Sequence, residues 1–133
     1  MQIILSDYNC IGHARALFRA LEVLDLLDLA PMQLMTFDEV GLRMTTDDET
    51  LWHFCQQKRY LLLTGNRTSK DGALSLEAII QRFITPASLP VLTIGDVDRV
   101  LLDRHYCARC AARLADIVFD LQTYQGVTRL YLS

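Results

Sequence analysis

The fold of this chain is decided by the stretch IILSDYNCIGH, residues Ile3–His13. A short apolar run ends in the acid Asp7, a polar turn follows, and a long amphipathic segment begins after the turn. This order predicts a buried strand that leads through a loop into a helix. In an open α/β sheet, ligands bind outside the carboxyl ends of the strands. Asp7 therefore stands where such a fold would place a functional side chain.

The rest of the chain alternates in the same way between short apolar runs and amphipathic segments. Strands are expected over residues 2–6, 33–37, 60–64, 91–94 and 127–132, and helices over residues 11–29, 47–59, 74–83, 97–103 and 105–121. Strands that alternate with helices form parallel pairs joined by right-handed crossovers. The sequence therefore predicts one domain over residues 1–133, a three-layer α/β/α fold of Rossmann-like type with a mainly parallel sheet of about five strands.

The composition is that of an ordinary globular domain. Hydrophobic residues make up 51% of the chain and charged residues 22%, and no apolar run approaches the roughly 20 residues that a membrane-spanning helix needs. The formal net charge of −3 argues against a protein that coats nucleic acid by bulk attraction, since such domains are usually basic. An enzyme that holds metal ions in an acidic site is compatible with this charge.

The cysteines and the lack of a signal-like N-terminus predict a cytoplasmic protein with reduced thiols. Cys107 and Cys110, with His105 nearby, form a CxxC motif of the kind found in zinc and redox sites. The pair lies within a helical pattern, whereas thioredoxin-like chemistry uses a strand-to-helix turn, and the chain has no second CxxC. We therefore expect structural thiols here.

Polar side chains stand where strands end and where the helix after the second strand begins. They are Asp7 and Asn9, Asn66 and Arg67, Asp96 and Asp98, and Asp47 and Asp48. In a parallel sheet all of these positions share one edge. Carboxylates that cluster without lysine partners favour a divalent metal, and Mg²⁺ prefers a few carboxylates together with waters and substrate phosphate oxygens. Such ions activate water and stabilise the leaving oxygen in phosphodiester cleavage.

Helix capping is the alternative explanation for three of these acids. Asp47, Asp48 and Asp96 each lie where an N-cap belongs, and capping alone would account for them. Asp7 ends a buried strand, and its only structural duty would be to cap the first helix. Asp7 is therefore the strongest functional candidate.

Three motifs resemble the PIN-like fold, and within it the bacterial PIN-like proteins related to toxin components. They are SDYN at 6–9 with GH at 12–13, DD at 47–48, and TGNR at 64–67. Through the order of its elements the resemblance covers nearly the whole chain. It implies a small Rossmann-like sheet and cleavage of RNA with Mg²⁺ or Mn²⁺ held by three or four acids.

The resemblance also implies roles for particular residues. Asp7 is similar to the first-strand metal acid, and Asp47 or Asp48 to the acid of the middle helix. Asn66 stands where the family has Asp in a Thr-x-Asp pattern, and an amide brings no charge to a metal, so we expect reduced affinity or activity. Asp71 or Asp96 would compensate. The implied set is Asp7, Asp48 and Asn66 for catalysis, Asp7, Asp47, Asp48, Asn66 and Asp96 for metal, and His13, Arg67 and Asn9 for substrate.

Basic side chains near this edge are candidates for phosphate contact. His13, in the first turn of the first helix, is placed to contact phosphate or to move a proton. A hydrogen bond to a loop carbonyl is the alternative role for its imidazole. Arg15, Arg67 and Lys70 lie on the same predicted edge and suit a phosphate backbone.

Three other aspartate-based or sheet-edge chemistries fit less well. A haloacid-dehalogenase-type phosphatase needs a second acid two residues after Asp7, where Asn9 stands. A receiver domain needs an acid at the end of the third strand, where Thr64 stands. A dinucleotide fold needs a glycine-rich turn after the first strand, which Gly12 alone does not supply.

Two hypotheses follow. The first is a metal-dependent endoribonuclease of PIN-like type, as in the toxin components. The second is a catalytically weak or inactive PIN-like module that binds an antitoxin-like protein or pairs as a homodimer. The sequence leaves open whether the chain is an enzyme.

Overall fold

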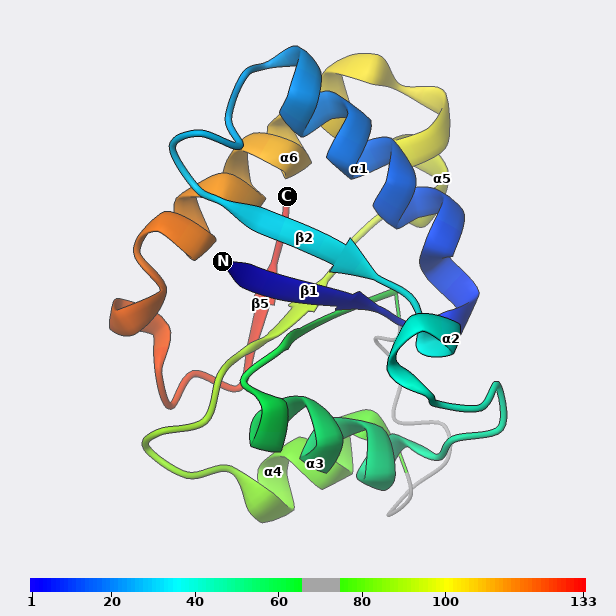
Figure 1. The fold of residues 1–133 in the computed structure, drawn as a ribbon, viewed down its shortest axis with the longest axis vertical. Coiled ribbons are helices and arrows are strands. Elements are labelled where there is room, and N and C mark those ends of the chain that lie inside the picture. Colours follow the sequence, from blue (N-terminus) through cyan, green and yellow to red (C-terminus); the bar gives the residue numbers. More distant parts are fainter. Residues whose placement is uncertain (66–74) are drawn as a thin grey trace.

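Five parallel strands form one sheet in the computed structural model, which describes residues 1–65 and 75–133 (Figure 1). The strands are β1 (Gln2–Ser6), β2 (Met32–Met35), β3 (Leu61–Thr64), β4 (Val91–Thr93) and β5 (Arg129–Tyr131). Their order across the sheet is β2-β1-β3-β4-β5, and every neighbouring pair is parallel. The predicted parallel sheet is confirmed.

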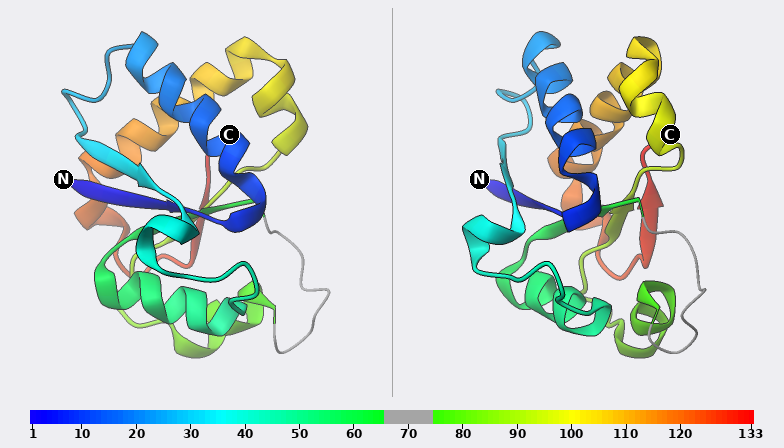
Figure 2. Two further views of the ribbon diagram at one scale, coloured as in Figure 1. Left: turned by 45° about the vertical axis from the view of Figure 1, so that its right-hand side comes forward. Right: turned by 90° about the vertical axis from the view of Figure 1, so that its right-hand side faces the viewer.

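Helices cover both faces of the sheet, which gives the predicted three-layer Rossmann-like architecture (Figures 1 and 2). The helices are η1 (Tyr8–Cys10), α1 (Ile11–Val23), α2 (Phe37–Val40), α3 (Asp48–Lys58), α4 (Leu76–Phe83), α5 (Val97–Leu102), α6 (Arg104–Phe119) and η3 (Leu121–Tyr124). One face packs against α1, α5 and α6, and the other against α3 and α4. Within the described residues, no helix is both long and apolar enough to cross a membrane.

Alternating side chains of the strands build a separate core on each face. Ile4 packs in the cluster under α1 and α6, whereas Leu5 packs in the cluster under α3 and α4. In β3, Leu61 and Leu63 belong to the first cluster and Leu62 to the second. All four β3 residues are buried, as a central strand covered on both faces requires.

The strand order reverses direction at β1. The chain passes from β1 to β2 on one side and then returns to place β3 on the other side of β1. Such a topological switch point leaves a crevice outside the carboxyl ends of the two strands, where ligands bind in open α/β sheets. Figure 1 shows β1 and β2 pointing the same way, so that both carboxyl ends lie beside α2 and the start of α1.

The first helix is shorter than predicted. It was expected to reach residue 29, but α1 ends at Val23 because a Schellman motif closes it. The N–H groups of Asp25 and Leu26 donate to the carbonyls of Glu22 and Leu21, and Asp25 has a left-handed φ of 57°. Leu24 continues the helical spacing of Leu17 and Leu21 in the sequence, but it is consequently exposed.

The second strand also ends earlier than predicted, and a short helix replaces part of the expected loop. The sequence predicts Phe37 in the strand, whereas in the structure Phe37 begins α2. Thr36 and Glu39 form a capping box, in which the Thr36 N–H donates to Glu39 Oε1 over 3.0 Å. Gly41 ends the helix with a φ of 80°. The helix lets Phe37 turn into the core beneath α3.

Candidate functional site

The Asp7 carboxylate is oriented by the neighbouring strand. Thr64, the last residue of β3, donates from Oγ1 to Asp7 Oδ2 over 2.7 Å. Leu5 in β1 and Leu62 in β3 both pack in the cluster under α3 and α4. Asp7 and Thr64 each lie two positions further along, so their side chains point to the same face of the sheet and meet there. In the described part of the chain, the hydrogen bonds of this carboxylate involve Oδ2 only. Among the described residues, Oδ1 therefore has no hydrogen-bond partner.

Backbone contacts fix the turn that carries Asp7. The Asp7 N–H donates to the Leu63 carbonyl over 2.9 Å, which extends the β1–β3 ladder by one residue. The Asp7 carbonyl accepts from the Ser6 hydroxyl and from the Cys10 N–H, over 3.0 and 3.1 Å. No helix-capping hydrogen bond is made by the Asp7 side chain. The Asp7 carboxylate therefore accepts a hydrogen bond from Thr64 and does not cap the helix that follows it.

The charge of Asp7 acts on two buried thiols. Burial raises the pKa of Cys10 to about 11 and the pKa of Cys55 to about 12, and the negative charge of Asp7 adds to both shifts. Cys55 lies on α3, so the negative charge of Asp7 at the end of β1 also affects a thiol on that helix. Both thiols stay protonated at neutral pH and are unsuited to be nucleophiles.

Polar side chains continue across the sheet from Asp7 on the same face. Thr93 of β4 is the register partner of Thr64 and accepts from Arg129 Nη1 over 2.7 Å. Arg129 in turn pairs with Glu77 of α4, with Nη2 and Oε2 3.0 Å apart. The Arg129 side chain is only 6% exposed and the Glu77 side chain is 39% exposed, so water reaches the glutamate end of this ion pair. We call Asp7, Thr64, Thr93, Arg129 and Glu77 the polar row. Of these residues, the sequence alone indicates only Asp7 as a functional candidate.

Two of the predicted metal acids are helix caps. Asp47 accepts from the Thr50 N–H over 2.8 Å at the start of α3, and hydrogen bonds from Thr50 hold the pKa of Asp47 below its ordinary value. Asp96 accepts from the Arg99 N–H over 3.2 Å at the start of α5. Asp48 is the first residue of α3 and is half-buried. The capping explanation is confirmed for Asp47 and Asp96.

The described residues do not bring a closed set of metal ligands together. No three side chains from His, Cys, Asp and Glu in residues 1–65 and 75–133 are placed to hold one ion. Asn66, Arg67, Lys70 and Asp71 lie outside the described residues. The acid that the structure does place at the switch point is Asp7.

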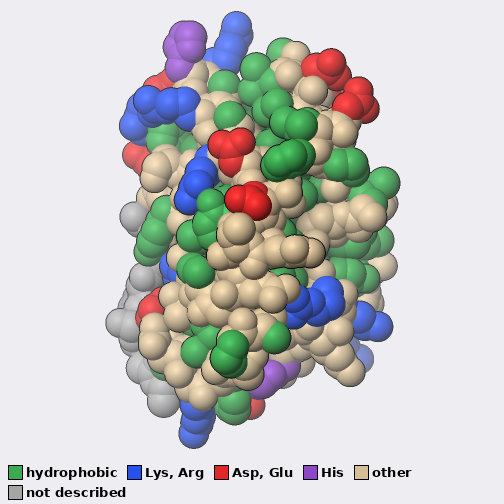
Figure 3. All heavy atoms as spheres, turned by 90° about the vertical axis from the view of Figure 1, so that its left-hand side faces the viewer, with side chains coloured by type: hydrophobic (Ala, Val, Ile, Leu, Met, Phe, Trp, Pro, Cys, Tyr) green, Lys and Arg blue, Asp and Glu red, His purple; other side chains and the backbone are tan. Residues whose placement is uncertain are grey.

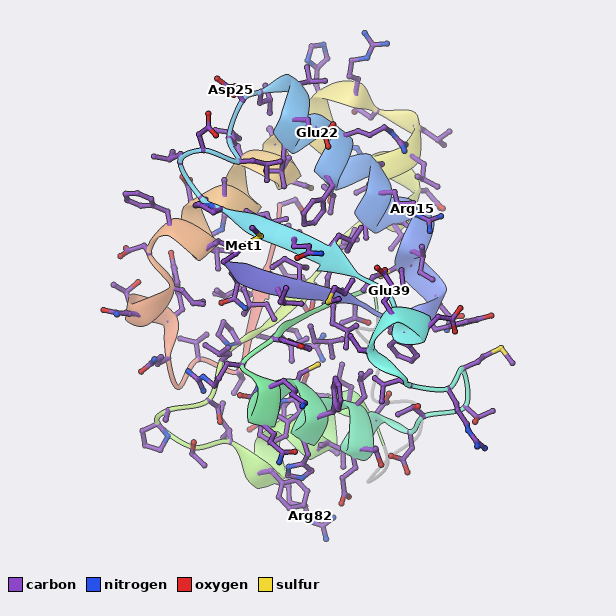
Figure 4. The ribbon with its side chains drawn as sticks, in the orientation of Figure 1. Met1, Arg15, Glu22, Asp25, Glu39 and Arg82 are labelled. Atoms are coloured by element: carbon purple, nitrogen blue, oxygen red, sulfur yellow. The ribbon has the colours of Figure 1, made fainter. Side chains whose placement is uncertain are left out.

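His13 lies in the first turn of α1 and is half-buried. Its Nδ1 atom is buried and makes no hydrogen bond to any residue that the structure describes. Asn9 is exposed in η1, and Arg15 extends from the exposed side of α1 (Figure 4). These three side chains remain candidates for substrate contact.

The CxxC pair in α6 behaves as buried apolar side chains. Cys107 and Cys110 are both buried and free, as are Cys10 and Cys55. Burial raises the pKa of both α6 thiols. These features agree with the predicted structural role.

Charges are dispersed on the face that carries the amino ends of β1 and β2. Figure 3 shows Lys, Arg, Asp and Glu side chains scattered there among apolar and uncharged groups. This face has no extended basic surface for nucleic acid among the residues drawn in colour.

No protein-family model matches this chain, and no curated protein or solved structure matches it either.

Proposed function

We propose that this chain is a metal-dependent ribonuclease of PIN-like type that cleaves RNA at the carboxyl ends of β1 and β3. The observation that carries the proposal is the Asp7 carboxylate at the topological switch point. It is oriented through Oδ2 by Thr64 and leaves Oδ1 unengaged by described residues. Substrates of open α/β sheets bind in this crevice.

The residues present fit Mg²⁺ or Mn²⁺ as an open site. Mg²⁺ keeps several waters and is commonly bound by one or two carboxylates together with substrate phosphates. One fixed, half-buried carboxylate therefore suits it, whereas a metal held by protein ligands alone would need the closed cluster that the described residues lack. Asp7 would be the principal ligand. Asp48 and Asn66 complete the set that the family resemblance implies.

When bound, the ion would supply an activated water and would stabilise the leaving oxygen of the phosphodiester. The chain's own contribution is to position groups around it. Thr64 holds the Asp7 carboxylate in one orientation, and such partners of ligating carboxylates are part of how a protein tunes a site. The imidazole of His13, in the first turn of α1, is a further candidate for contact with a phosphate oxygen. Asn9 and Arg67 are further candidates for the RNA backbone.

The second candidate function is a catalytically weak or inactive PIN-like module with an antitoxin-like protein as its partner. Two observations favour it. Asn66 replaces a family acid, and capping already occupies one carboxylate oxygen of Asp47 and of Asp96. Both candidate functions would place the protein in the cytoplasm, because its four free cysteines suit a reducing compartment.

Cleavage of a fluorescently labelled single-stranded RNA, measured with added Mn²⁺, tests the first function. We expect the wild type to cleave, and Asp7→Asn to lose cleavage while keeping its fold by circular dichroism. The control is Asp116→Asn, which removes an exposed acid of α6 and should leave the rate unchanged. Equal cleavage by Asp7→Asn and the wild type would reject the assignment, and no cleavage by the wild type would favour the interaction module.

A further inference from the structure

A groove of about 730 Å³ lies between α1 on one side and α5 with the start of α6 on the other. These helices cover the face of the sheet opposite to that of Asp7 and Thr64. The hollow forms where α1 presents two small side chains, Ala16 and Ala20, one helical turn apart. Small-molecule sites commonly have volumes of about 300–1,000 Å³, so the groove has the size of such a site. We call it the α1–α5 groove.

Apolar side chains form most of the lining, and several of them are exposed to water. Val23 at the end of α1 is 85% exposed, and Leu102 at the end of α5 is 86% exposed. Leu24 and Leu101 are also exposed beside the same groove. Single exposed apolar residues are normal, whereas several that gather at one hollow mark an interaction site or a ligand groove. An apolar group bound here would remove this surface from water.

The other side chains that line the groove are basic. They are Arg19 of α1 and, at the start of α6, Arg104 and His105. No acid among the described residues lines the groove. Arg99 of α5 pairs with Asp103 over 3.1 Å, whereas Arg19 and Arg104 form no ion pair with any residue that the structure describes. The groove therefore combines apolar surface with positive charge that no neighbouring acid neutralises.

The positive charge acts across the groove, and the nearest acids of α1 lie beyond it. Burial raises the pKa of the Cys107 thiol on α6, and the charge of Arg19 on α1 counteracts part of that rise. Figure 4 shows Glu22 and Asp25 near the carboxyl end of α1, and neither lines the groove. An anionic bilayer laid over this end of the molecule would meet these acids, whereas a single small anion in the groove meets the arginines.

We propose that the α1–α5 groove binds a single-chain fatty carboxylate, a ligand that the ribonuclease activity proposed at Asp7 does not require. The alkyl chain packs against the apolar lining and the carboxylate pairs with Arg19 and Arg104. The lining of α1 extends from Ala16 to Leu24, a rise of about 12 Å at about 1.5 Å per residue. Single carbon–carbon bonds are about 1.5 Å long, so a zigzag chain of about ten carbons covers this length.

Calorimetric titration with sodium decanoate, below the concentration at which it forms micelles, tests the proposal. We expect the wild type to bind decanoate, and the affinity to fall about fourfold for each methylene removed from the chain. Octanoate should therefore bind about 15-fold more weakly than decanoate. Dodecanoate should gain less than this factor, because its chain is longer than the groove. No binding of decanoate, or an affinity that does not change with chain length, would overturn the proposal.

Decyltrimethylammonium carries the same chain length on a cation and so tests the role of charge. The wild type should bind it about tenfold more weakly than decanoate, because two arginines attract the carboxylate and repel the ammonium. Arg19→Gln combined with Arg104→Gln should remove this preference. The matched control, Arg43→Gln with Arg109→Gln, makes the same change in net charge at exposed positions outside the groove and should keep it. Equal binding of both ligands by the wild type, or equal effects of the two double variants, would overturn the proposal.

One further pair of variants locates the alkyl chain. Leu102→Ser should keep the fold, because the replaced side chain is almost fully exposed, and should weaken decanoate binding at least about threefold. Phe119→Ser is the control, since it removes an apolar side chain, 65% exposed, at the far end of α6. Equal effects of these two variants would place the chain elsewhere. Binding to phosphatidylglycerol vesicles without binding of decanoate would assign the groove to a membrane surface and overturn the proposal.

Discussion

Replacing Thr64 by valine is the perturbation that most directly tests how the candidate site is built. Valine keeps the branched shape of threonine in the buried β3 position but removes the hydroxyl that donates to Asp7 Oδ2 over 2.7 Å. The change therefore leaves a half-buried carboxylate without that donor. We expect two separate effects, one on stability and one on metal binding.

The stability effect follows from the type of bond. A hydrogen bond to a charged group contributes about 1.5–3 kcal/mol to the free energy of unfolding. Water reaches the half-buried Asp7 and replaces part of the lost bond, so we expect a loss of about 1–2 kcal/mol. For a chain of this size the melting temperature should fall by about 3–8 °C. Urea unfolding followed by circular dichroism measures the free energy directly.

The expected effect on metal affinity follows from the role of Thr64 in orienting the Asp7 carboxylate. Removing a partner that orients a metal ligand typically weakens metal binding by about 10–100-fold. Calorimetric titration of Mn²⁺ into Thr64→Val should show this loss, whereas Thr64→Ser, which keeps a hydroxyl, should recover most of the affinity.

The matched control is Thr93→Val. Thr93 is equally buried on the adjacent strand, but its hydroxyl accepts from Arg129 rather than donating to Asp7. This variant should lose stability without a comparable change in Mn²⁺ affinity. Unchanged stability of Thr64→Val, or equal Mn²⁺ affinity in Thr64→Val and Thr93→Val, would refute the reasoning.

Three further predictions concern the structure around the site. The folded pKa values of about 11 for Cys10 and about 12 for Cys55 lie above the ordinary value of 9.0. Unfolded thiols therefore lose protons first, and the free energy of unfolding should fall above pH 9 by up to about 1.4 kcal/mol per pH unit for each thiol. Urea midpoints at rising pH measure this slope, and Cys55→Ala should flatten it. Gly65→Ala should destabilise the fold by about 1–3 kcal/mol, because the added Cβ would lie 2.8 Å from Val97 Cγ1; thermal unfolding should show rescue by a second change, Val97→Ala. Arg129→Met should cost about 1–3 kcal/mol by urea unfolding, because it leaves the buried hydroxyl of Thr93 in β4 without the Arg129 donor and removes the ion pair to the partly exposed Glu77 of α4.

The sheet and the position of Asp7 could be predicted from sequence because both depend on local pattern. Short continuous apolar runs with amphipathic segments between them indicate buried parallel strands, and Asp7 follows such a run by one residue. The cap at Asp47 was also predictable, because an acid before a helical pattern has a local role.

Other features depend on contacts that the sequence does not display. The bond between Thr64 and Asp7 joins residues 57 positions apart and exists only in the register that pairs Ser6 with Leu63. The ion pair between Arg129 and Glu77 likewise joins a strand and a helix 52 positions apart. The early end of α1 was missed for a different reason. Leu24 and Leu27 continue the helical stripe, while the left-handed turn at Asp25 carries no glycine to mark it.

The measurement that tests the central claim most directly is a thermal unfolding titration with Mn²⁺ on the wild type, Asp7→Asn and Asp116→Asn. A ligand that binds only the folded state at 100 times its dissociation constant adds about 2.7 kcal/mol, which corresponds to a rise of about 10 °C for a chain of this size. The account predicts this rise in the wild type and in Asp116→Asn, and its loss in Asp7→Asn. An equal rise in all three proteins, or no rise in the wild type at saturating metal, would contradict a metal site at Asp7.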